Sequence, residues 1–125
     1  MRATTLDAGA LIAVERADRR VTALLTAARA RGERLAVPAG ALAQVWRDGR
    51  RQARLSALLR SRAVDVVPLD DVDARLAGQL CGLRRTKDVV DASVVACAIR
   101  RGGVVLTSDL EDLQRLERRL RLVPV

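Results

Sequence analysis

The sequence contains no histidine, tyrosine or phenylalanine, and Trp46 is its only aromatic residue. Without histidine, the chain cannot use a histidine general base, a Ser–His or Cys–His catalytic arrangement, or most types of zinc site. Without several aromatic rings, it cannot bind RNA by stacking bases on an aromatic sheet surface. Any catalysis must therefore rely on carboxylates, hydroxyls, arginine or a bound cation.

Cysteines and long apolar runs are also scarce. Cys81 and Cys97 are the only cysteines, and their separation fits no metal-binding or redox motif. We expect both to pack as small apolar side chains within helices. No apolar stretch is long enough to span a bilayer, and the N-terminal residues do not resemble a signal peptide. These absences predict a cytoplasmic protein with no membrane association.

Positive charge is what the chain has in excess, with 23 Lys and Arg residues against 15 Asp and Glu residues. The formal net charge of +8 favours polyanionic partners such as RNA. However, every basic residue except Lys87 is arginine, and a GC-rich genome would produce the same bias. Arg47, Arg50 and Arg51 are candidate phosphate contacts, and a solvated helix end is the alternative interpretation of each.

Apolar residues make up half of the chain, which predicts one domain over residues 1–125 with a substantial core. Short apolar runs alternate with helical patterns, as in an α/β fold whose central parallel sheet of four to five strands has helices on both faces. The strands are expected at 3–6, 35–37, 64–67, 104–106 and, more weakly, 120–123. The helices are expected at 8–15, 21–30, 38–47, 52–60, 71–83, 88–101 and 110–118.

Two aspartates directly follow predicted strands: Asp7 ends the first and Asp109 ends the fourth. Ligands of open α/β sheets bind at the carboxyl ends of strands where the strand order reverses. If the first and fourth strands are neighbours, these two side chains meet there. Asp91 is expected to join them. Two glycines link the end of its helix to the start of the fourth strand, so the start of the helix must lie at the opposite edge of the sheet, beside Asp7 and Asp109. That helix is apolar nearly all round, so a carboxylate in its first turn calls for an explanation.

Helix capping is the alternative explanation for these acids. The spacing D-x-x-D occurs at three predicted helix starts: Asp70/Asp73, Asp88/Asp91 and Asp109/Asp112. At such positions aspartates cap free N–H groups and complement the helix dipole. We expect capping alone at Asp70/Asp73, whose strand should lie at a sheet edge. For Asp91 and Asp109 the convergence with Asp7 favours a site instead. Clustered carboxylates repel one another unless a cation neutralises them, and oxygen ligands without histidine or cysteine indicate Mg²⁺ or Mn²⁺.

Three segments of the sequence resemble motifs of a known family. Residues 6–13 (LDAGALIA) resemble the first motif of PIN domains, and residues 90–98 and 105–109 resemble the third and fourth. The set covers essentially the whole chain and is closest to the VapC-type toxins of bacterial toxin–antitoxin pairs. The resemblance implies a three-layer PIN-like fold and a Mg²⁺-dependent endoribonuclease, with Asp7, Asp91 and Asp109 as catalytic, metal-binding acids. It also implies a homodimer that binds an RNA substrate and is inhibited by a cognate antitoxin.

One motif of the family is altered in this chain. The second family acid, usually a glutamate, corresponds to Gln44, which keeps a carbonyl oxygen but loses a negative charge. That loss should weaken the binding of a divalent cation, and Asp88 or Asp112 could partly compensate. Ser108 could orient a water molecule or a phosphate oxygen, or could equally cap a helix. Two hypotheses therefore stay open: a toxin endoribonuclease, or a catalytically weak or inactive PIN-fold binding module.

A receiver-type phosphoacceptor domain is a further alternative, because it also gathers aspartates at strand ends. Such a domain normally has paired acids after the first strand and a lysine late in the chain. Here Asp7 stands alone and Lys87 does not end a strand. No glycine-rich phosphate loop follows the first strand either, which disfavours nucleotide-binding folds.

Overall fold

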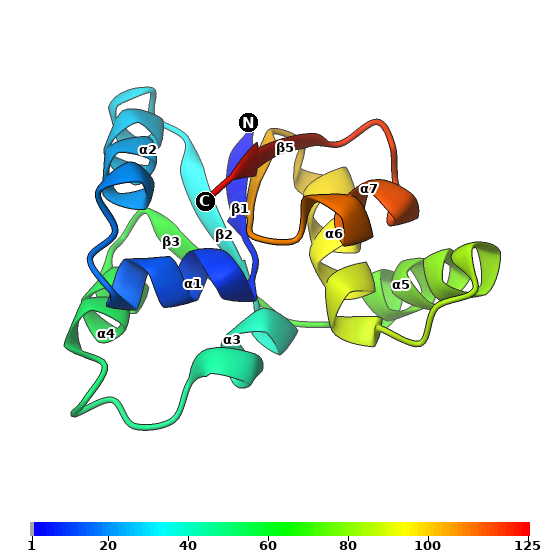
Figure 1. Ribbon diagram of the computed structural model, residues 1–125, viewed down its shortest axis with the longest axis horizontal. Coiled ribbons are helices and arrows are strands. Elements are labelled where there is room, and N and C mark those ends of the chain that lie inside the picture. Colours follow the sequence, from blue (N-terminus) through cyan, green and yellow to red (C-terminus); the bar gives the residue numbers. More distant parts are fainter. Residues whose placement is uncertain (1) are drawn as a thin grey trace.

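Five parallel strands form a single sheet, and the computed structural model describes them within residues 2–125. The strands are β1 (Ala3–Leu6), β2 (Arg34–Pro38), β3 (Val64–Val67), β4 (Val104–Thr107) and β5 (Arg121–Pro124). Their order is β3-β2-β1-β4-β5 (Figure 1). The first and fourth strands are therefore neighbours, which meets the condition on which the convergence of Asp7 and Asp109 depends, and the strand order reverses between them. The carboxyl ends of β1 and β4 form the edge at which a ligand of such a sheet is expected.

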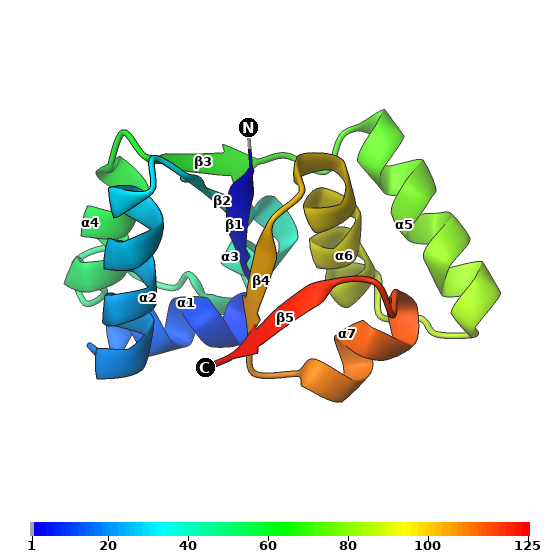
Figure 2. The same cartoon turned by 90° about the horizontal axis from the view of Figure 1, so that it is seen from above.

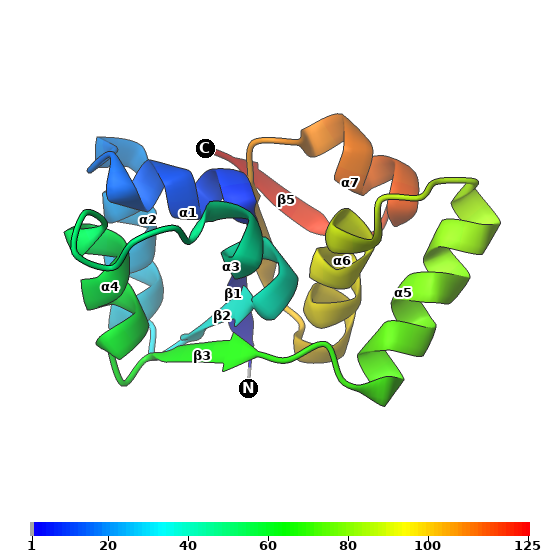
Figure 3. The same ribbon diagram turned by 90° about the horizontal axis from the view of Figure 1, so that it is seen from below.

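Helices cover both faces of the sheet, which confirms the predicted three-layer α/β fold. They are α1 (Ala8–Glu15), α2 (Arg19–Ala30), α3 (Ala39–Val45), α4 (Ala53–Arg60), α5 (Asp71–Arg84), α6 (Val89–Arg101) and α7 (Leu110–Leu116). Figure 2 shows α1, α2 and α4 on one side of β1 and β4, and α5, α6 and α7 on the other. Seen from below, α3 lies between α1 and α6 and contacts both (Figure 3). In residues 2–125 none of the helices combines the length and the apolar character needed to cross a membrane.

The core extends over both faces of the sheet, and burial is most continuous where the sheet meets α6. All four residues of β1 are buried, and so is every residue from Ala92 to Ala98 in α6. A parallel sheet covered on both faces buries its central strands completely, because neither face of it meets water, and in β1 this includes the two threonines Thr4 and Thr5. Cys97 is buried in this layer and Cys81 is partly buried in α5, and both are free thiols, as the packing prediction requires.

Several helix boundaries differ from the prediction by one or two residues, and at two of them a side chain that caps the backbone gives the reason. Helix α2 begins at Arg19 rather than Val21, since the Asp18 carboxylate accepts a hydrogen bond from Val21 N at 2.9 Å. Helix α3 ends at Val45 rather than at Arg47. Its end is fixed by Gln52, whose amide donates to the Val45 carbonyl at 2.8 Å. Pro38, expected to start α3, is instead the last residue of β2 and precedes the helix.

The Gln52 side chain also shapes the connection that follows α3. Its carbonyl oxygen accepts from the backbone N–H groups of Arg47 and Asp48, at 2.8 and 3.0 Å. Beside this turn lies the only aromatic ring: a Cβ added at Gly49 would come within 3.1 Å of Trp46 Cζ2. The α3–α4 connection is therefore an ordered turn built on one glutamine and one tryptophan.

Candidate metal centre

Asp7 lies at the carboxyl end of β1 and is only 3% exposed. One carboxylate oxygen accepts from Ala10 N at 2.9 Å, and the other accepts from the Thr107 hydroxyl at 2.5 Å. The same hydroxyl oxygen accepts from Asp109 N at 2.8 Å. Thr107 therefore connects the first acid to the backbone of the third. Because its hydroxyl hydrogen is engaged by Asp7, this side chain positions the acids and has no proton left to donate elsewhere.

Three carboxylates converge beside this buried acid. Asp91, Asp109 and Asp112 each offer an oxygen, and the three oxygens lie within 4.8 Å of one another. They come from the first turn of α6, from the β4–α7 junction and from the first turn of α7. The structure thus brings together two of the acids predicted as primary ligands and one, Asp112, predicted only as a secondary candidate. Asp7 is not one of the three carboxylates in this group, but it lies close enough to Asp109 for the charge of Asp109 to raise its pKa.

The electrostatics of this group are those of uncompensated negative charge. Burial raises the pKa of Asp91, and the neighbouring carboxylates Asp88, Asp109 and Asp112 raise it further, to about 7. Burial also raises the pKa of Asp7, although its hydrogen bonds with Thr107, Ala10 N and Ser108 N act in the opposite direction. Within residues 2–125, neither these two acids nor Asp109 or Asp112 pairs with an arginine or lysine within 4.0 Å.

Asp88 performs the capping role that its spacing predicted. Its carboxylate accepts from Asp91 N at 2.9 Å and so closes the first turn of α6. It also lines a hollow of about 160 Å³ together with Asp91 and Asp112. Asp88 therefore both holds the backbone of Asp91 and adds negative charge next to its side chain.

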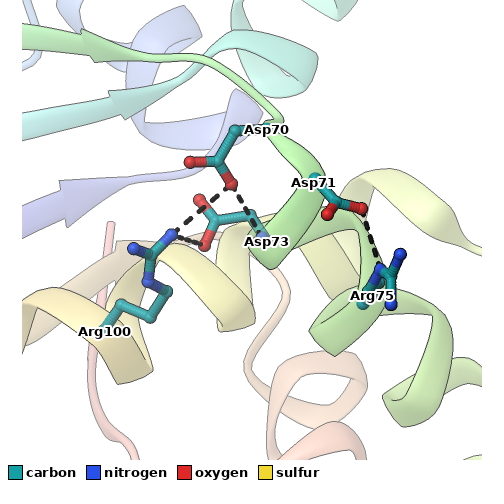
Figure 4. Close-up of polar contacts among 5 residues, drawn as sticks. All are labelled: Asp70, Asp71, Asp73, Arg75 and Arg100. Carbon is teal, nitrogen blue, oxygen red and sulfur yellow. Dashed lines mark hydrogen bonds and ion pairs between the residues drawn. The ribbon is translucent and has the colours of Figure 1, made fainter.

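Capping explains the other two aspartate pairs incompletely. Asp109 precedes α7, but its side chain makes no capping hydrogen bond, so that alternative fails for this residue. Asp70 does cap, accepting from Asp73 N at 2.8 Å. Asp73 itself is buried and accepts from Arg100 at 2.5 Å (Figure 4), so the prediction of capping alone is wrong for this residue. The missed signal was Arg100, which comes from the last turn of α6 and is distant in sequence.

Gly9 keeps the β4–α7 junction close to α1. A Cβ added to Gly9 would collide with the Oγ and Cβ atoms of Ser108. The absence of a side chain at Gly9 therefore lets Ser108, and the acid that follows it, lie against the first turn of α1. Ser108 is itself exposed at the edge of the site.

The remaining predicted residues lie elsewhere. Gln44 is exposed on α3 and lines a separate hollow with Ile12 and Glu15. Arg47 lines that hollow too, and its guanidinium donates to the carbonyls of Ala43 and Trp46. Arg50 and Arg51 are exposed on the turn after α3. No described hydrogen bond or ion pair in residues 2–125 links these side chains to the acidic group.

The three-carboxylate group fits a divalent cation of the hard, oxygen-preferring kind. Its donors are all carboxylate oxygens that lie within 4.8 Å of one another, and in residues 2–125 none of them pairs with an arginine or lysine within 4.0 Å. Burial and neighbouring negative charges raise the pKa of a carboxyl. A raised pKa is expected of a carboxylate ligand in its metal-free form, because the bound cation replaces the proton.

Comparison with known proteins identifies a family and a fold. The sequence profile of the PIN domain matches residues 4–119. Three solved structures with similar folds are VapBC2 from Rickettsia felis bound to a promoter DNA fragment, DNA-bound VapBC from Salmonella typhimurium, and FitAcB from Neisseria gonorrhoeae. The TM-scores are 0.77, 0.75 and 0.68, with sequence identities of 14%, 17% and 17%. The aligned region covers 98%, 99% and 95% of this chain, and 98%, 98% and 95% of theirs. Sequence comparison with curated proteins finds no match.

Proposed function

This chain belongs to the PIN domain family, and on that premise we propose that it is a metal-dependent endoribonuclease, the toxin of a VapBC-type toxin–antitoxin pair. The observation that carries the proposal is the group formed by Asp91, Asp109 and Asp112 at the carboxyl end of β4, with no cationic partner in residues 2–125. Phosphodiester hydrolysis needs positive charge beside the scissile phosphate, and a group of carboxylates can bind the divalent cation that supplies it.

In this proposal Asp91, Asp109 and Asp112 hold Mg²⁺ or Mn²⁺, and the buried Asp7 lies next to them, linked to Asp109 through Thr107. When bound, the cation supplies the positive charge that stabilises the reacting phosphate and makes a nearby water molecule more acidic. The protein holds the acids in place from the buried side: the Thr107 hydroxyl donates to Asp7 and accepts from Asp109 N. Asp88 fixes the backbone of Asp91 from the other side.

The solved structures with similar folds support a protein partner. They are structures of VapBC, FitAcB and FitAB, and the motifs of this chain resemble those of VapC-type toxins. We extend this to a cognate antitoxin that inhibits the present chain, and to a homodimer of it in the cytoplasm. Size-exclusion chromatography with light scattering tests the dimer. Co-expression with the reading frame next to its gene tests the antitoxin, and cleavage suppressed by that product is the expected result.

The central test is cleavage of a panel of RNAs by the purified chain with Mg²⁺, with Mn²⁺ and with EDTA. We expect cleavage that needs the cation, and a loss of about 100-fold or more in Asp91→Asn and in Asp109→Asn. The matched control is Asp71→Asn, which removes an exposed aspartate in the first turn of α5 and should change the rate by less than about twofold. Cleavage unchanged in the two site variants would overturn the site assignment.

The alternative left by Gln44 is a PIN fold that binds without cutting. Mn²⁺ binding followed by electron paramagnetic resonance separates the two functions, because it does not depend on turnover. Mn²⁺ binding that is lost in Asp91→Asn, with no cleavage of any RNA by the wild-type chain, would favour the binding module. Cation-dependent cleavage by the wild-type chain would exclude it.

A further inference from the structure

An arginine-lined hollow adjoins the acidic group on the side of α5 and α7. The hollow of about 160 Å³ that Asp91 and Asp112 line is also lined by Arg84, Arg85 and Arg115. Two of these arginines, Arg84 and Arg115, also line a wider hollow of about 590 Å³, whose remaining walls are Gln114 and Arg118. The narrow acidic space therefore adjoins a broader basic one, with two arginines shared between them.

The arginines of this wall are not used by the fold as ion-pair partners. In the described part of the chain, no carboxylate lies within 4.0 Å of the guanidinium groups of Arg84, Arg85, Arg115 or Arg118. This holds even though Asp112 is only one helical turn away from Arg115 on α7. Opposite charges share one hollow here without pairing, so both remain available to a ligand.

Local structure fixes where these side chains stand. The Arg84 Nε donates to the Leu116 carbonyl at 3.4 Å, which ties the end of α5 to the end of α7 and leaves the rest of the guanidinium free. Arg85 has left-handed backbone torsions, with φ 55° and ψ 48°, an uncommon state for a residue with a side chain. That turn ends α5 and places Arg84, Arg85 and Thr86 along the same wall as Asp88.

We propose that Arg84 and Arg115, assisted by Arg85 and Arg118, form a phosphate subsite that holds single-stranded RNA beside the bond cut at the acidic group. The inference rests on the proposed function and names how its substrate is held. Guanidinium groups bind phosphate oxygens through paired N–H donors, whereas the acids hold the cation that meets the adjacent phosphate. The hollow of about 160 Å³ is small beside a duplex, and for that reason we assign the substrate as a single strand. Because phosphate contacts carry no base information, this subsite positions the strand without selecting its sequence.

The chemistry of the shared hollow favours RNA over an acidic peptide. A peptide carboxylate that reached the arginines would also face Asp88, Asp91 and Asp112, which repel it. A nucleic acid is surrounded by condensed cations and can share one with these carboxylates.

The test measures RNA binding without cleavage, so that it does not depend on activity. The affinity of a fluorescent single-stranded RNA for the full chain is measured by anisotropy in EDTA, over a series of salt concentrations. For Arg84→Ala/Arg115→Ala we expect a dissociation constant at least about tenfold higher at low salt, and a salt slope reduced by about 1.4, since each single-strand phosphate contact contributes about 0.7. The matched control, Arg19→Ala/Arg29→Ala, removes the same charge from two exposed positions of α2, on the opposite side of β1 and β4 from α5 and α7 (Figure 2), and should change the slope by less than half as much.

Arg115→Lys adds a charge-preserving control. It should keep the wild-type salt slope, because the charge is retained, and should raise the dissociation constant less than Arg115→Ala does, because lysine still binds phosphate as a point charge. Equal or larger losses in the control pair would overturn the subsite. Tighter binding of duplex RNA, or of polyglutamate, than of the single strand through the same arginines would also overturn it. If Asp91-dependent cleavage is present but these variants bind normally, the subsite fails and the nuclease stands. If they bind poorly but nothing is cut, the reverse holds.

Discussion

Helices α5 and α6 begin with the same capping pattern, but the second aspartate of the pattern has a cationic neighbour in α5 and acidic neighbours in α6. In each, the first aspartate of a D-x-x-D pair caps the backbone N–H of the second: Asp70 bonds to Asp73 N at 2.8 Å and Asp88 bonds to Asp91 N at 2.9 Å. Asp73 then meets the guanidinium of Arg100 (Figure 4). Asp91 pairs with no arginine or lysine within 4.0 Å in residues 2–125, and burial together with Asp88, Asp109 and Asp112 raises its pKa to about 7.

The same helix supplies both halves of this contrast. Arg100 lies in the last turn of α6 and neutralises the acid of α5, whereas Asp91 lies in the first turn of α6 and has no protein cation within 4.0 Å among residues 2–125. Sequence spacing therefore determines the cap, and the neighbouring elements determine whether the second acid is structural or available to a ligand.

The largest expected effect comes from removing the cation of the structural pair. Arg100→Gln should lower the free energy of unfolding by about 3 kcal/mol, because Asp73, whose side chain is 5% exposed, is left buried without a partner. Arg75→Gln is the control: its pair with Asp71 is exposed and should be worth less than about 0.5 kcal/mol. Urea denaturation measures both. Equal losses in the two variants would show that burial of Asp73 does not matter.

The corresponding change at the other pair should act in the opposite direction. Without a divalent cation at pH 8, Asp91→Asn should raise the free energy of unfolding by about 1–2 kcal/mol, allowing for the screening of a half-exposed group by solvent. The reason is that burial and three neighbouring carboxylates oppose the charge that the amide lacks. Asp73→Asn should instead destabilise the protein. A lower stability of Asp91→Asn under these conditions would refute the interpretation of Asp91 as uncompensated.

The pH dependence of stability should show the same contrast with a somewhat smaller effect. A carboxyl whose folded-state pKa is raised from 3.8 to about 7 favours the folded state while it is protonated, and this contribution is lost as the pH rises through 7. The raised pKa of Asp7 acts in the same direction, whereas the lowered pKa values of Asp65 and Asp70 matter only near pH 4 and below.

Between pH 5.5 and 7.5 in EDTA, we therefore expect the free energy of unfolding to fall by about 1 kcal/mol, and to fall less in Asp91→Asn. Saturating Mg²⁺ should flatten or reverse this slope, because a ligand of the folded state stabilises it. Chemical denaturation at several pH values provides the measurement, and a rise in stability with pH in EDTA would contradict the prediction.

The smallest effect is expected at Gln44. Its side chain is exposed and lines a hollow with Glu15 and Arg47, and no described contact connects it to the acids. We therefore expect Gln44→Glu to change Mn²⁺ affinity by less than about threefold, because a charge on an exposed side chain is screened by water. Titration of Mn²⁺ into both proteins measures this. A tenfold gain would show that the α3 position does belong to the cation site and that the natural glutamine weakens it.

The sheet and the first acids could be predicted because local signals agree with the topology. Gly102 and Gly103 both have positive φ, and a Cβ at Gly103 would collide with the backbone of Ala3. This tight turn forces the end of α6 next to the start of β4, and so forces Asp91 to the edge that carries Asp109. That reasoning uses only chain connectivity, which the sequence contains.

The side-chain contacts could not be predicted in the same way. Arg100 reaches Asp73 across 27 residues, and Gln52 ends α3 from the far side of a turn. Asp112 belongs to the acidic group because of the direction in which α7 runs after the end of β4. Each depends on the relative placement of two elements, and the periodicity of either element alone does not contain it.

Trp46, beside the ordered turn between α3 and α4, can serve as an intrinsic fluorescence probe. It is the only fluorescent aromatic residue of the chain, it is 38% exposed, and it lies beside Gly49 on a turn held by Gln52. Its emission therefore comes from one place on the surface, away from the acids, with no background from tyrosine. A shift in that emission when a partner without tryptophan is added would indicate that the partner contacts the α3–α4 turn or its surroundings.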